Sequence, residues 1–378
     1  MESFRLMATT AFGLESICAR ELHELGIENT STHNGYVEFQ GGIRDIAKTN
    51  LWLRTADRVL VLAAKFPALT FDDLFEGVKA LPWSDWMSAN ARFPVEGRSV
   101  NSKLSSVPAC QSIVKKAIVE SLKRTYPMET FPENGPLFAV EVALHNDEAI
   151  ITIDTSGDAL HKRGYRTQTH LAPLRETLAA GLVLLSRWAP HRPFADPMCG
   201  SGTIAIEAAM IGLNLAPGSR RDFVCESWPW FDSIIMTEER ESALDAIQLD
   251  IPVNIFASDV DKASISMAQY HARKAGVNDC IEWHTSDVRS WSPSEQYGCL
   301  VTNPPYGDRM GEQREVEELY RDFGATMKSA DSWSVFVITS HKNFEHLYGK
   351  KADKRRKLYN GRIETTFYQY LGPLPPRR

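Results

Sequence analysis

Four apolar segments in the second half of the chain each end in a side chain that accepts hydrogen bonds. Asp196, Asp259, Asp287 and Asn303 follow these segments in that order. In open α/β sheets the carboxyl ends of parallel strands meet at one edge, and ligands bind beyond that edge. If the four segments are strands of such a sheet, their polar ends form one binding site. The alternative is that the aspartates only cap turns.

A glycine-containing turn follows the first segment, in "DPMCGSGT" (residues 196–203). Glycines between a strand and a helix allow the backbone to pass close to a ligand. The spacing is not the G-x-G-x-x-G of dinucleotide folds, and no Lys-Ser/Thr pair of a phosphate loop follows. The carboxylates instead favour a ligand with cationic character and ribose hydroxyls.

S-adenosylmethionine has these groups: a sulfonium, an amino-acid head, a ribose and an adenine. Asp259 would accept hydrogen bonds from the ribose diol, and Asp287 would accept them from the exocyclic amine of the adenine. Cys199 is interpreted as a small residue that fits the tight turn, because methylation of an amine needs no thiol nucleophile. The predicted cofactor-binding residues on the four strand ends are Asp196, Pro197, Cys199, Gly200, Ser201, Gly202, Thr203, Asp259, Val260, Asp287, Val288 and Asn303.

The fourth segment ends in "NPPY", and its residues Asn303, Pro304, Pro305 and Tyr306 are the predicted catalytic residues. The Asn303 side-chain oxygen and the Pro304 carbonyl can accept the hydrogens of a ring amine, so that its lone pair points at a methyl donor. The prolines stiffen this corner before the reaction, and Tyr306 offers a face to a base pulled out of its helix. No strong general base is required, because the nitrogen becomes acidic once methylated. The alternative is an ordinary strand-ending turn.

The elements that must position these residues alternate regularly from about residue 172. Expected helices over 176–188, 203–213, 262–276 and 316–329 separate the apolar segments, which predicts a mostly parallel, doubly wound α/β sheet. An Asn-Gly turn at 360–361 indicates a last hairpin that could add an antiparallel strand.

Two smaller α/β regions precede this sheet. Residues 1–60 contain an amphipathic helix over 14–25 and a strand after a turn in "HNGYVEFQG". Residues 59–156 contain expected helices over 71–81 and 108–126 and a hairpin around "HND" (145–147). We expect helices to pack on one sheet there.

The composition is that of a globular protein of 378 residues with a formal net charge of −6. No apolar run approaches the roughly 18 residues that span a bilayer. Six scattered cysteines without a C-x-x-C pair argue against a disulfide framework or a zinc site. We therefore expect a cytoplasmic protein without a metal. Residues 341–378 hold ten Lys or Arg and three Asp or Glu, a local excess of seven positive charges.

"DPMCGSGT" followed by "NPPY" resembles class I (Rossmann-like) S-adenosylmethionine-dependent methyltransferases that act on amino groups. With "SVPACQSIVKKAI", "LHKRGYR", "APLRETLAAGLV" and "NPPYGDRMG", the whole chain resembles the THUMP-domain RNA methyltransferases of the YpsC/RlmL-like group. The resemblance implies a ferredoxin-like unit over 1–58, a THUMP domain over 59–156, a linker over 157–171 and the methyltransferase domain over 172–378. Longer members carry a second methyltransferase domain, so one methylation activity is expected of this chain.

Family resemblance also implies that the turn with Arg175 and Glu176 lines the cofactor pocket, although helix capping would explain Glu176. Positive side chains near an aromatic residue are typical of RNA contacts. Such contacts are expected of Lys162, Arg163, Tyr165 and Arg166 in "HKRGYR" and of Lys115 and Lys116. An interdomain hinge and a solvated helix face are the respective alternatives.

Known family members methylate N2 of guanine in 23S rRNA, so this reaction is the expected function, with RNA as the partner. The substrate could be naked RNA or an assembling large ribosomal subunit. Methylation of guanine N2 in tRNA, or of adenine N6 in RNA or DNA, remains open because the corner recognises an amine and not a base. The alternative from a different functional class is a non-catalytic RNA-binding protein. The oligomeric state is not predicted.

Overall fold

The computed structural model of the protein describes residues 3–166, 174–307 and 312–376. The chain forms two compact units, each built from segments that are not consecutive in the sequence. Unit 1 comprises Met1–Thr10, Ala19–Leu160 and Asp222–Glu241, and unit 2 comprises Ala11–Cys18, His161–Arg221 and Ser242–Arg378. Residues 167–171 of the predicted linker lie outside the described residues.

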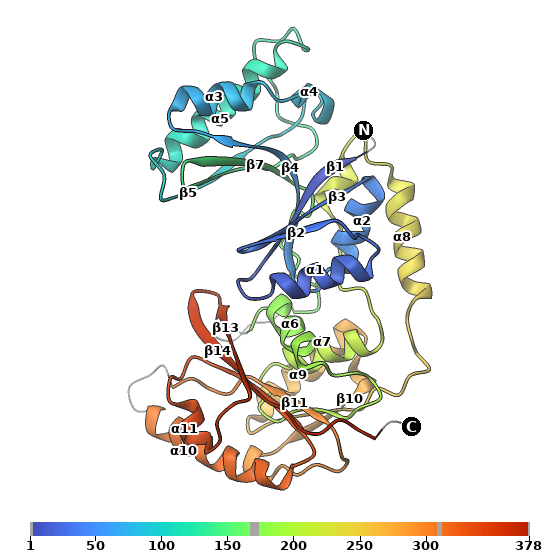
Figure 1. Ribbon diagram of the computed structural model, residues 1–378. Helices are drawn as coiled ribbons and strands as arrows, with labels where there is room; N and C mark the ends of the chain where they lie inside the picture. Colours follow the sequence, from blue (N-terminus) through green and yellow to red (C-terminus); the bar gives the residue numbers. More distant parts are fainter. Residues whose placement is uncertain (1–2, 167–173, 308–311, 377–378) are drawn as a thin grey trace. The chain divides into compact units, whose positions relative to one another are not determined.

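Seven described strands form one sheet in unit 1, in the order β2-β3-β1-β4-β7-β6-β5 (Figure 1). They are β1 (Phe4–Thr10), β2 (Thr30–His33), β3 (Tyr36–Gly41), β4 (Ala56–Pro67), β5 (Val95–Val100), β6 (Val140–His145) and β7 (Glu148–Asp154). β4 pairs with β1 on one side and with β7 on the other. The regions predicted as two separate domains therefore share one continuous sheet.

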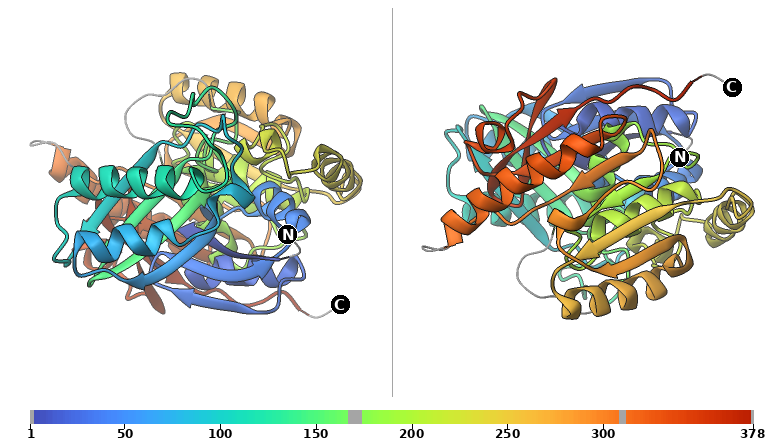
Figure 2. Two further views of the ribbon diagram at one scale, coloured as in Figure 1. Left: turned by 90° about the horizontal axis from the view of Figure 1, so that it is seen from above. Right: turned by 90° about the horizontal axis from the view of Figure 1, so that it is seen from below.

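The helices of unit 1 include α3 and α5, which lie side by side on one face of the sheet (Figure 2). The described helices wholly within the unit are α2 (Ile43–Trp52), α3 (Phe71–Lys79), α4 (Trp83–Trp86) and α5 (Val107–Leu122). Helices α1 (Glu15–Glu24) and α8 (Ser233–Asp245) contribute residues to both units. Asn146 and Asp147 have φ values of 50° and 64°, as a type I′ turn requires, and the hairpin predicted around "HND" is confirmed.

Residues 222–241 fall within the range predicted for the catalytic domain, yet they belong to unit 1. Trp228 is buried and stacks on Phe138, with ring centroids 4.6 Å apart. The Trp230 indole N–H donates to the Trp86 carbonyl oxygen at 3.0 Å, and its ring stacks on Phe4. The tryptophans of this segment are thus accounted for by packing within unit 1.

Seven described strands also form the sheet of unit 2, in the order β10-β9-β8-β11-β12-β14-β13. They are β8 (Phe194–Asp196), β9 (Ile255–Asp259), β10 (Ile281–Thr285), β11 (Cys299–Thr302), β12 (Ser334–Thr339), β13 (Lys354–Asn360) and β14 (Ile363–Tyr370). The first five strands of this order are parallel, and β14 is antiparallel to β12. The predicted doubly wound sheet and its antiparallel last strand are confirmed.

Both faces of this sheet are covered, as expected of a largely parallel sheet. The described α-helices wholly within unit 2 are α6 (Glu176–Ser186), α7 (Thr203–Gly212), α9 (Lys262–Ala275), α10 (Glu312–Thr326) and α11 (Phe344–Tyr348). Alternate strand residues face opposite sides: Val335 packs in one cluster with α10 and α11, and Phe336 packs in another with α6, α7 and α9. Leu14 is fully buried in the second cluster, and a Cβ atom added to Gly181 would lie 2.6 Å from it.

Candidate active site

The end of β8 is tied to the end of its neighbour β11. The Thr302 hydroxyl donates to Asp196 Oδ1 at 2.7 Å, and both residues are almost fully buried. Burial raises the pKa of Asp196 to about 7, and the hydrogen bonds from Thr302 and from the Met198 backbone oppose this rise. Asp196 is therefore a buried carboxyl group that is fixed by the Thr302 hydroxyl and becomes protonated close to neutral pH.

The turn after β8 contains two glycines, Gly200 and Gly202, whose surroundings differ. Gly200 and Gly202 have φ values of 51° and 80°, which favour glycine. A Cβ atom on Gly202 would lie 2.9 Å from both the Ala268 Cβ atom and the Trp283 ring, whereas one on Gly200 would meet nothing within 4 Å. Gly202 thus permits close packing of α7, and Gly200 leaves one side of the backbone open.

Asp259 at the end of β9 holds this turn. Its Oδ2 accepts a hydrogen bond from the Gly200 N–H at 2.9 Å, and its Oδ1 accepts one from the Asp261 N–H at 3.0 Å. The next residue, Val260, is 66% exposed. An exposed apolar side chain beside a carboxylate suits a ligand with a flat ring and neighbouring hydroxyls.

The other residues of the turn are fixed by backbone contacts. The Cys199 N–H donates to the Ser258 carbonyl oxygen at 2.9 Å, and the Pro197 carbonyl accepts from the Ser258 hydroxyl at 3.3 Å. Burial and the neighbouring carboxylates raise the pKa of the Cys199 thiol, which disfavours a thiolate. His271 Nδ1 lies 3.4 Å from the Ser201 carbonyl oxygen, and Thr203 begins α7.

Asp287 lies two residues beyond β10 and caps the short 3-10 helix Val288–Ser290. Its Oδ1 accepts from the Arg289 N–H at 2.8 Å, and its Oδ2 accepts from the Arg289 guanidinium at 2.9 Å. The Val288 side chain is buried. A helix cap and an ion pair with Arg289 account for these contacts, and the predicted adenine contact remains a prediction.

The NPPY corner starts directly after β11. Asn303 is partly buried, and its Oδ1 accepts a hydrogen bond from the Tyr306 hydroxyl at 2.7 Å. Pro304 is buried and Pro305 is exposed. The Pro305 carbonyl oxygen accepts a hydrogen bond from the Tyr320 hydroxyl at 2.7 Å. The corner therefore places an amide oxygen and an aromatic ring at the same sheet edge as the glycine turn.

These features fit S-adenosylmethionine as cofactor. Asp259 provides a carboxylate for hydroxyl groups, Gly200 opens the backbone and Val260 provides apolar surface, while the buried Asp196 holds the end of β8 against β11. All belong to β8 and β9 or to the turns that follow them, where open α/β sheets bind ligands.

Glu176 begins α6 and is 3% exposed. Its pKa is raised mainly by burial, while the Arg166 guanidinium, 3.5 Å away, opposes this. Arg166 also donates to the Thr203 hydroxyl at 2.6 Å and to the Leu174 carbonyl at 2.9 Å. The adjacent Arg175 is exposed at the amino terminus of α6. Arg166 thus links α6 to the first residue of α7, which argues for a structural role.

The prediction that Arg163 and Tyr165 contact RNA needs correction. They are 3% and 2% exposed, and both point to the buried Glu207: the Tyr165 hydroxyl donates to Glu207 Oε1 at 3.1 Å, and Arg163 Nε lies 3.5 Å away. A buried tyrosine has no face for a base. Lys162, by contrast, is exposed. A lone glutamate in the otherwise apolar "TIAIEAAM" indicates that Glu207 is buried, but it does not identify the partners of its carboxylate.

Lys115 and Lys116 lie on α5 of unit 1. Lys115 pairs with Glu133 at 2.6 Å and donates to the Phe93 carbonyl oxygen at 2.9 Å. Lys116 Nζ lies 5.8 Å from the centroid of the Phe75 ring. Since the charge of Lys115 is already paired, Lys116 is the better candidate of the two for an RNA phosphate.

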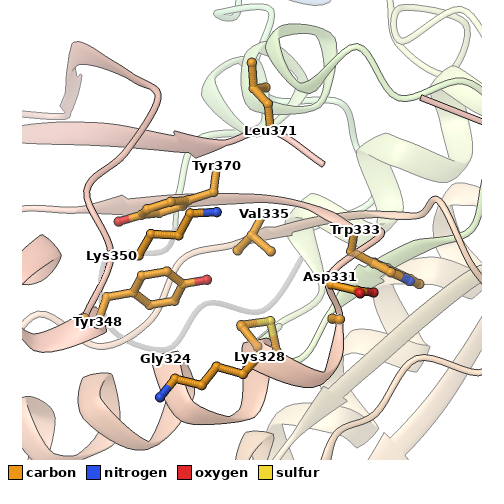
Figure 3. Close-up of a pocket in the computed structure, with 12 residues that line it drawn as sticks. Gly324, Lys328, Asp331, Trp333, Val335, Tyr348, Lys350, Tyr370 and Leu371 are labelled. Atoms are coloured by element: carbon orange, nitrogen blue, oxygen red, sulfur yellow. The ribbon is translucent and has the colours of Figure 1, made fainter. Parts of the chain in front are cut away.

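Figure 3 shows a cavity of about 390 Å³ whose lining includes Trp333 and Val335, at the amino end of β12. Because β12 runs parallel to β11, this end of the sheet lies opposite the polar strand ends. Tyr348, Tyr370 and Trp333 line it, with Lys328 and Lys350. The three aromatic residues are at most 7% exposed, and the Tyr348 and Tyr370 rings pack together at 4.5 Å between centroids. They offer no open ring face to a base, so the cavity does not form part of the candidate site.

None of the helices in the described part of the chain is both long and apolar enough to cross a membrane. Within residues 3–166, 174–307 and 312–376, no group of three or more His, Cys, Asp or Glu side chains is placed to hold a metal ion.

Sequence models of three families match successive parts of the chain. Residues 5–60 match the RlmL ferredoxin-like domain, residues 68–154 match the THUMP domain, and residues 163–369 match the "RMKL-like, methyltransferase domain" (UPF0020). The last match alone covers more than half of the 378 residues.

Two curated relatives match along the whole chain. One is the "Putative RNA methyltransferase YpsC" of Bacillus subtilis, 47% identical over 100% of this chain and 98% of that protein. The other is the "Ribosomal RNA large subunit methyltransferase K/L" of Psychromonas ingrahamii, 35% identical over 98% of this chain. This chain spans 50% of that longer protein.

Two solved structures share the fold at high identity. A "predicted N6-adenine-specific DNA methylase" from Listeria monocytogenes is 49% identical, with a TM-score of 0.94 over 99% of this chain and 97% of that one. The "putative methyltransferase" SMU.472, complexed with SAH, is 43% identical, with a TM-score of 0.94 over 100% of both chains.

Proposed function

Because the chain belongs to the RMKL-like family of S-adenosylmethionine-dependent RNA methyltransferases, we propose that it methylates the exocyclic N2 amine of a guanine in 23S rRNA. The observation that carries the proposal is the NPPY corner at the carboxyl end of β11, next to the strand that ends in Asp196. The choice of ribosomal RNA draws on the printed name of the Psychromonas relative. A cytosolic location, expected from the scattered cysteines, suits this substrate.

Asn303 and Pro304 orient the amine that receives the methyl group. The amine lone pair is delocalised into the ring, so the nitrogen is a poor nucleophile until its geometry changes. The Asn303 Oδ1 atom and the Pro304 carbonyl oxygen accept its two hydrogens and turn the lone pair out of the ring plane. Tyr306 stacks on the ring that carries the amine.

Asp259, Asp287 and the 196–203 turn hold the cofactor. S-adenosylmethionine supplies an electrophilic methyl group on a sulfonium. With the cofactor bound, the amine nitrogen oriented by Asn303 and Pro304 would take this methyl group, the carbon–sulfur bonding electrons would stay on sulfur, and the nitrogen would lose its proton to water. Asp259 is the proposed ribose acceptor, and the open side of Gly200 lets the cofactor approach the backbone.

The residues proposed to bind RNA lie partly in unit 1, where the THUMP domain matches residues 68–154. Lys116 and the exposed Lys162 are the proposed phosphate contacts. Arg163 and Tyr165 are withdrawn from this set.

Adenine N6 is the competing acceptor, because the Listeria relative is titled as a predicted N6-adenine-specific methylase. Mass spectrometry of nucleosides from rRNA and tRNA of a strain without the gene tests both readings. Loss of N2-methylguanosine from 23S rRNA supports the proposal. Loss of N2-methylguanosine from tRNA would indicate a tRNA substrate, and loss of N6-methyladenosine would indicate that adenine is the methylated base. In assays with the purified protein, RNA binding without methyl transfer would support a non-catalytic protein.

A further inference from the structure

The backbone of the NPPY corner is restrained by its own sequence up to Pro305. The pyrrolidine rings fix φ of Pro304 and Pro305, and a following proline restricts ψ of Asn303 and of Pro304 to extended values. No proline follows Pro305, so its ψ is the first backbone torsion after φ of Asn303 that the sequence leaves unrestrained. This torsion sets the direction in which the Tyr306 ring leaves the corner.

Tyr320 of α10 supplies the missing restraint. Its hydroxyl donates to the Pro305 carbonyl oxygen at 2.7 Å, and its side chain is fully buried. The position of a carbonyl oxygen follows from ψ of its own residue. A donor that holds this oxygen therefore holds ψ of Pro305.

Tyr320 is itself held by the end of β12. Its hydroxyl lies 2.9 Å from the Thr339 hydroxyl, which accepts a hydrogen bond from the His341 N–H at 3.1 Å. The Pro305 carbonyl can only accept and the His341 N–H can only donate. Thr339 therefore donates to Tyr320, and Tyr320 donates to Pro305. Chains of hydrogen bonds in one direction strengthen one another.

We propose that Tyr320 is a positioning residue for methyl transfer, acting through the Pro305 carbonyl with support from Thr339. This inference rests on the proposed function of the NPPY corner. Tyr320 contacts neither base nor cofactor in this role. Without its hydroxyl the Tyr306 ring still stacks on the base but holds the amine out of line with the methyl group, so kcat should fall while the binding of both substrates stays nearly unchanged.

The first experiment compares Tyr320→Phe with Tyr370→Phe in the full chain. Both tyrosines are buried in the same aromatic cluster, and the Tyr370 hydroxyl has no hydrogen-bond partner among the described residues. Tyr320→Phe should lower kcat about 10-fold or more, with the RNA KM and the cofactor Kd within about twofold of wild type. Tyr370→Phe should behave as wild type. An unchanged kcat for Tyr320→Phe, or an equal loss in both variants, overturns the proposal.

Thr339→Val tests the chain without altering Tyr320. It should lower kcat by less than Tyr320→Phe does, and the double variant should be no slower than Tyr320→Phe alone, because both changes interrupt one chain. If the kcat losses of the two single variants add in the double variant, Thr339 and Tyr320 act independently, which would contradict the proposed chain of hydrogen bonds. If Tyr320→Phe fails to fold, a kcat loss at unchanged KM in Thr339→Val still supports the proposal, and an unchanged kcat overturns it.

Crystal structures of the two phenylalanine variants separate this inference from the proposed function. A wild-type protein that methylates no RNA contradicts the proposed function alone. In that case, a displaced Pro305 carbonyl and Tyr306 ring in Tyr320→Phe only would still support the positioning role. A corner identical in both variants would refute it.

Discussion

The Tyr306 hydroxyl donates a hydrogen bond to Asn303 Oδ1 at 2.7 Å, so the acceptor proposed for the substrate amine is already occupied. A base that enters the corner must replace this donor.

Tyr306→Phe should therefore leave methyl transfer largely intact. The ring remains for stacking, and the competing hydroxyl is gone, so the RNA KM should stay equal or fall. Tyr306→Ala removes the ring and should raise KM about 10-fold or more, since stacking contributes about 1–3 kcal/mol per base. Steady-state methylation of rRNA checks both variants. Equal damage in the two would mean that the hydroxyl, and not the ring, serves the reaction.

Asn303→Ala should lower kcat at least about 100-fold, because removal of one well-placed polar group at a reacting centre costs about that much. Cofactor affinity should change little, since the glycine turn and Asp259 remain. Transfer of a radiolabelled methyl group measures the first effect, and calorimetry measures the second. Full activity in this variant would eliminate the corner as the catalytic element.

Asp259→Ala should weaken cofactor binding about 10-fold or more. The carboxylate is the proposed ribose acceptor, and it also accepts the Gly200 N–H at 2.9 Å. Asp259→Asn is the matched control, because an amide keeps one oxygen acceptor and replaces the second with a donor. We expect an intermediate affinity for it by calorimetry. Wild-type affinity in Asp259→Ala would contradict the assigned role.

Asp196 should make the stability of the protein depend on pH. Burial raises its pKa from the ordinary 3.8 to about 7 in the folded state. The folded state then binds the proton more tightly than the unfolded state does, so this contribution is full below about pH 4 and is lost as pH rises through 7. The difference corresponds to about 4 kcal/mol.

Urea unfolding of the wild type and of Asp196→Asn, from pH 4 to pH 8, measures this effect. The free energy of unfolding of the wild type should fall relative to that of the variant across this range. Parallel curves for the two proteins would show that Asp196 titrates near its ordinary pKa.

The strand ends of unit 2 can be predicted from local sequence, whereas the pairing of its buried polar side chains cannot. Short apolar runs that end in Asp196, Asp259 and Asn303 predict strand ends, because strand length and turn residues are local properties. The pairing of Tyr165 with Glu207 joins residues 42 positions apart, and no local pattern specifies it. The contact between Tyr320 and Pro305 was missed for the same reason.

The sequence also does not predict which segments belong to each of the two units. Residues 222–241 lie between β8 and β9 in the sequence but pack within unit 1, and Leu14 lies in the core of unit 2. A truncation at residue 155 would remove Leu14 from that core. Point substitutions in the full chain are therefore the better tests of RNA recognition.

The adjacent Lys162 and Arg163 give such a test. Arg163 is buried beside Glu207, so Arg163→Ala leaves a buried carboxylate without this partner and should cost about 3–5 kcal/mol of stability. Lys162 is exposed, and Lys162→Ala should change stability by less than about 0.5 kcal/mol. If Lys162 contacts a phosphate, its loss should weaken RNA binding and reduce the slope of log K against log salt by about 1. Thermal unfolding and RNA binding at several salt concentrations separate the two residues. An Arg163→Ala variant of normal stability with weak RNA binding would restore the original prediction for Arg163.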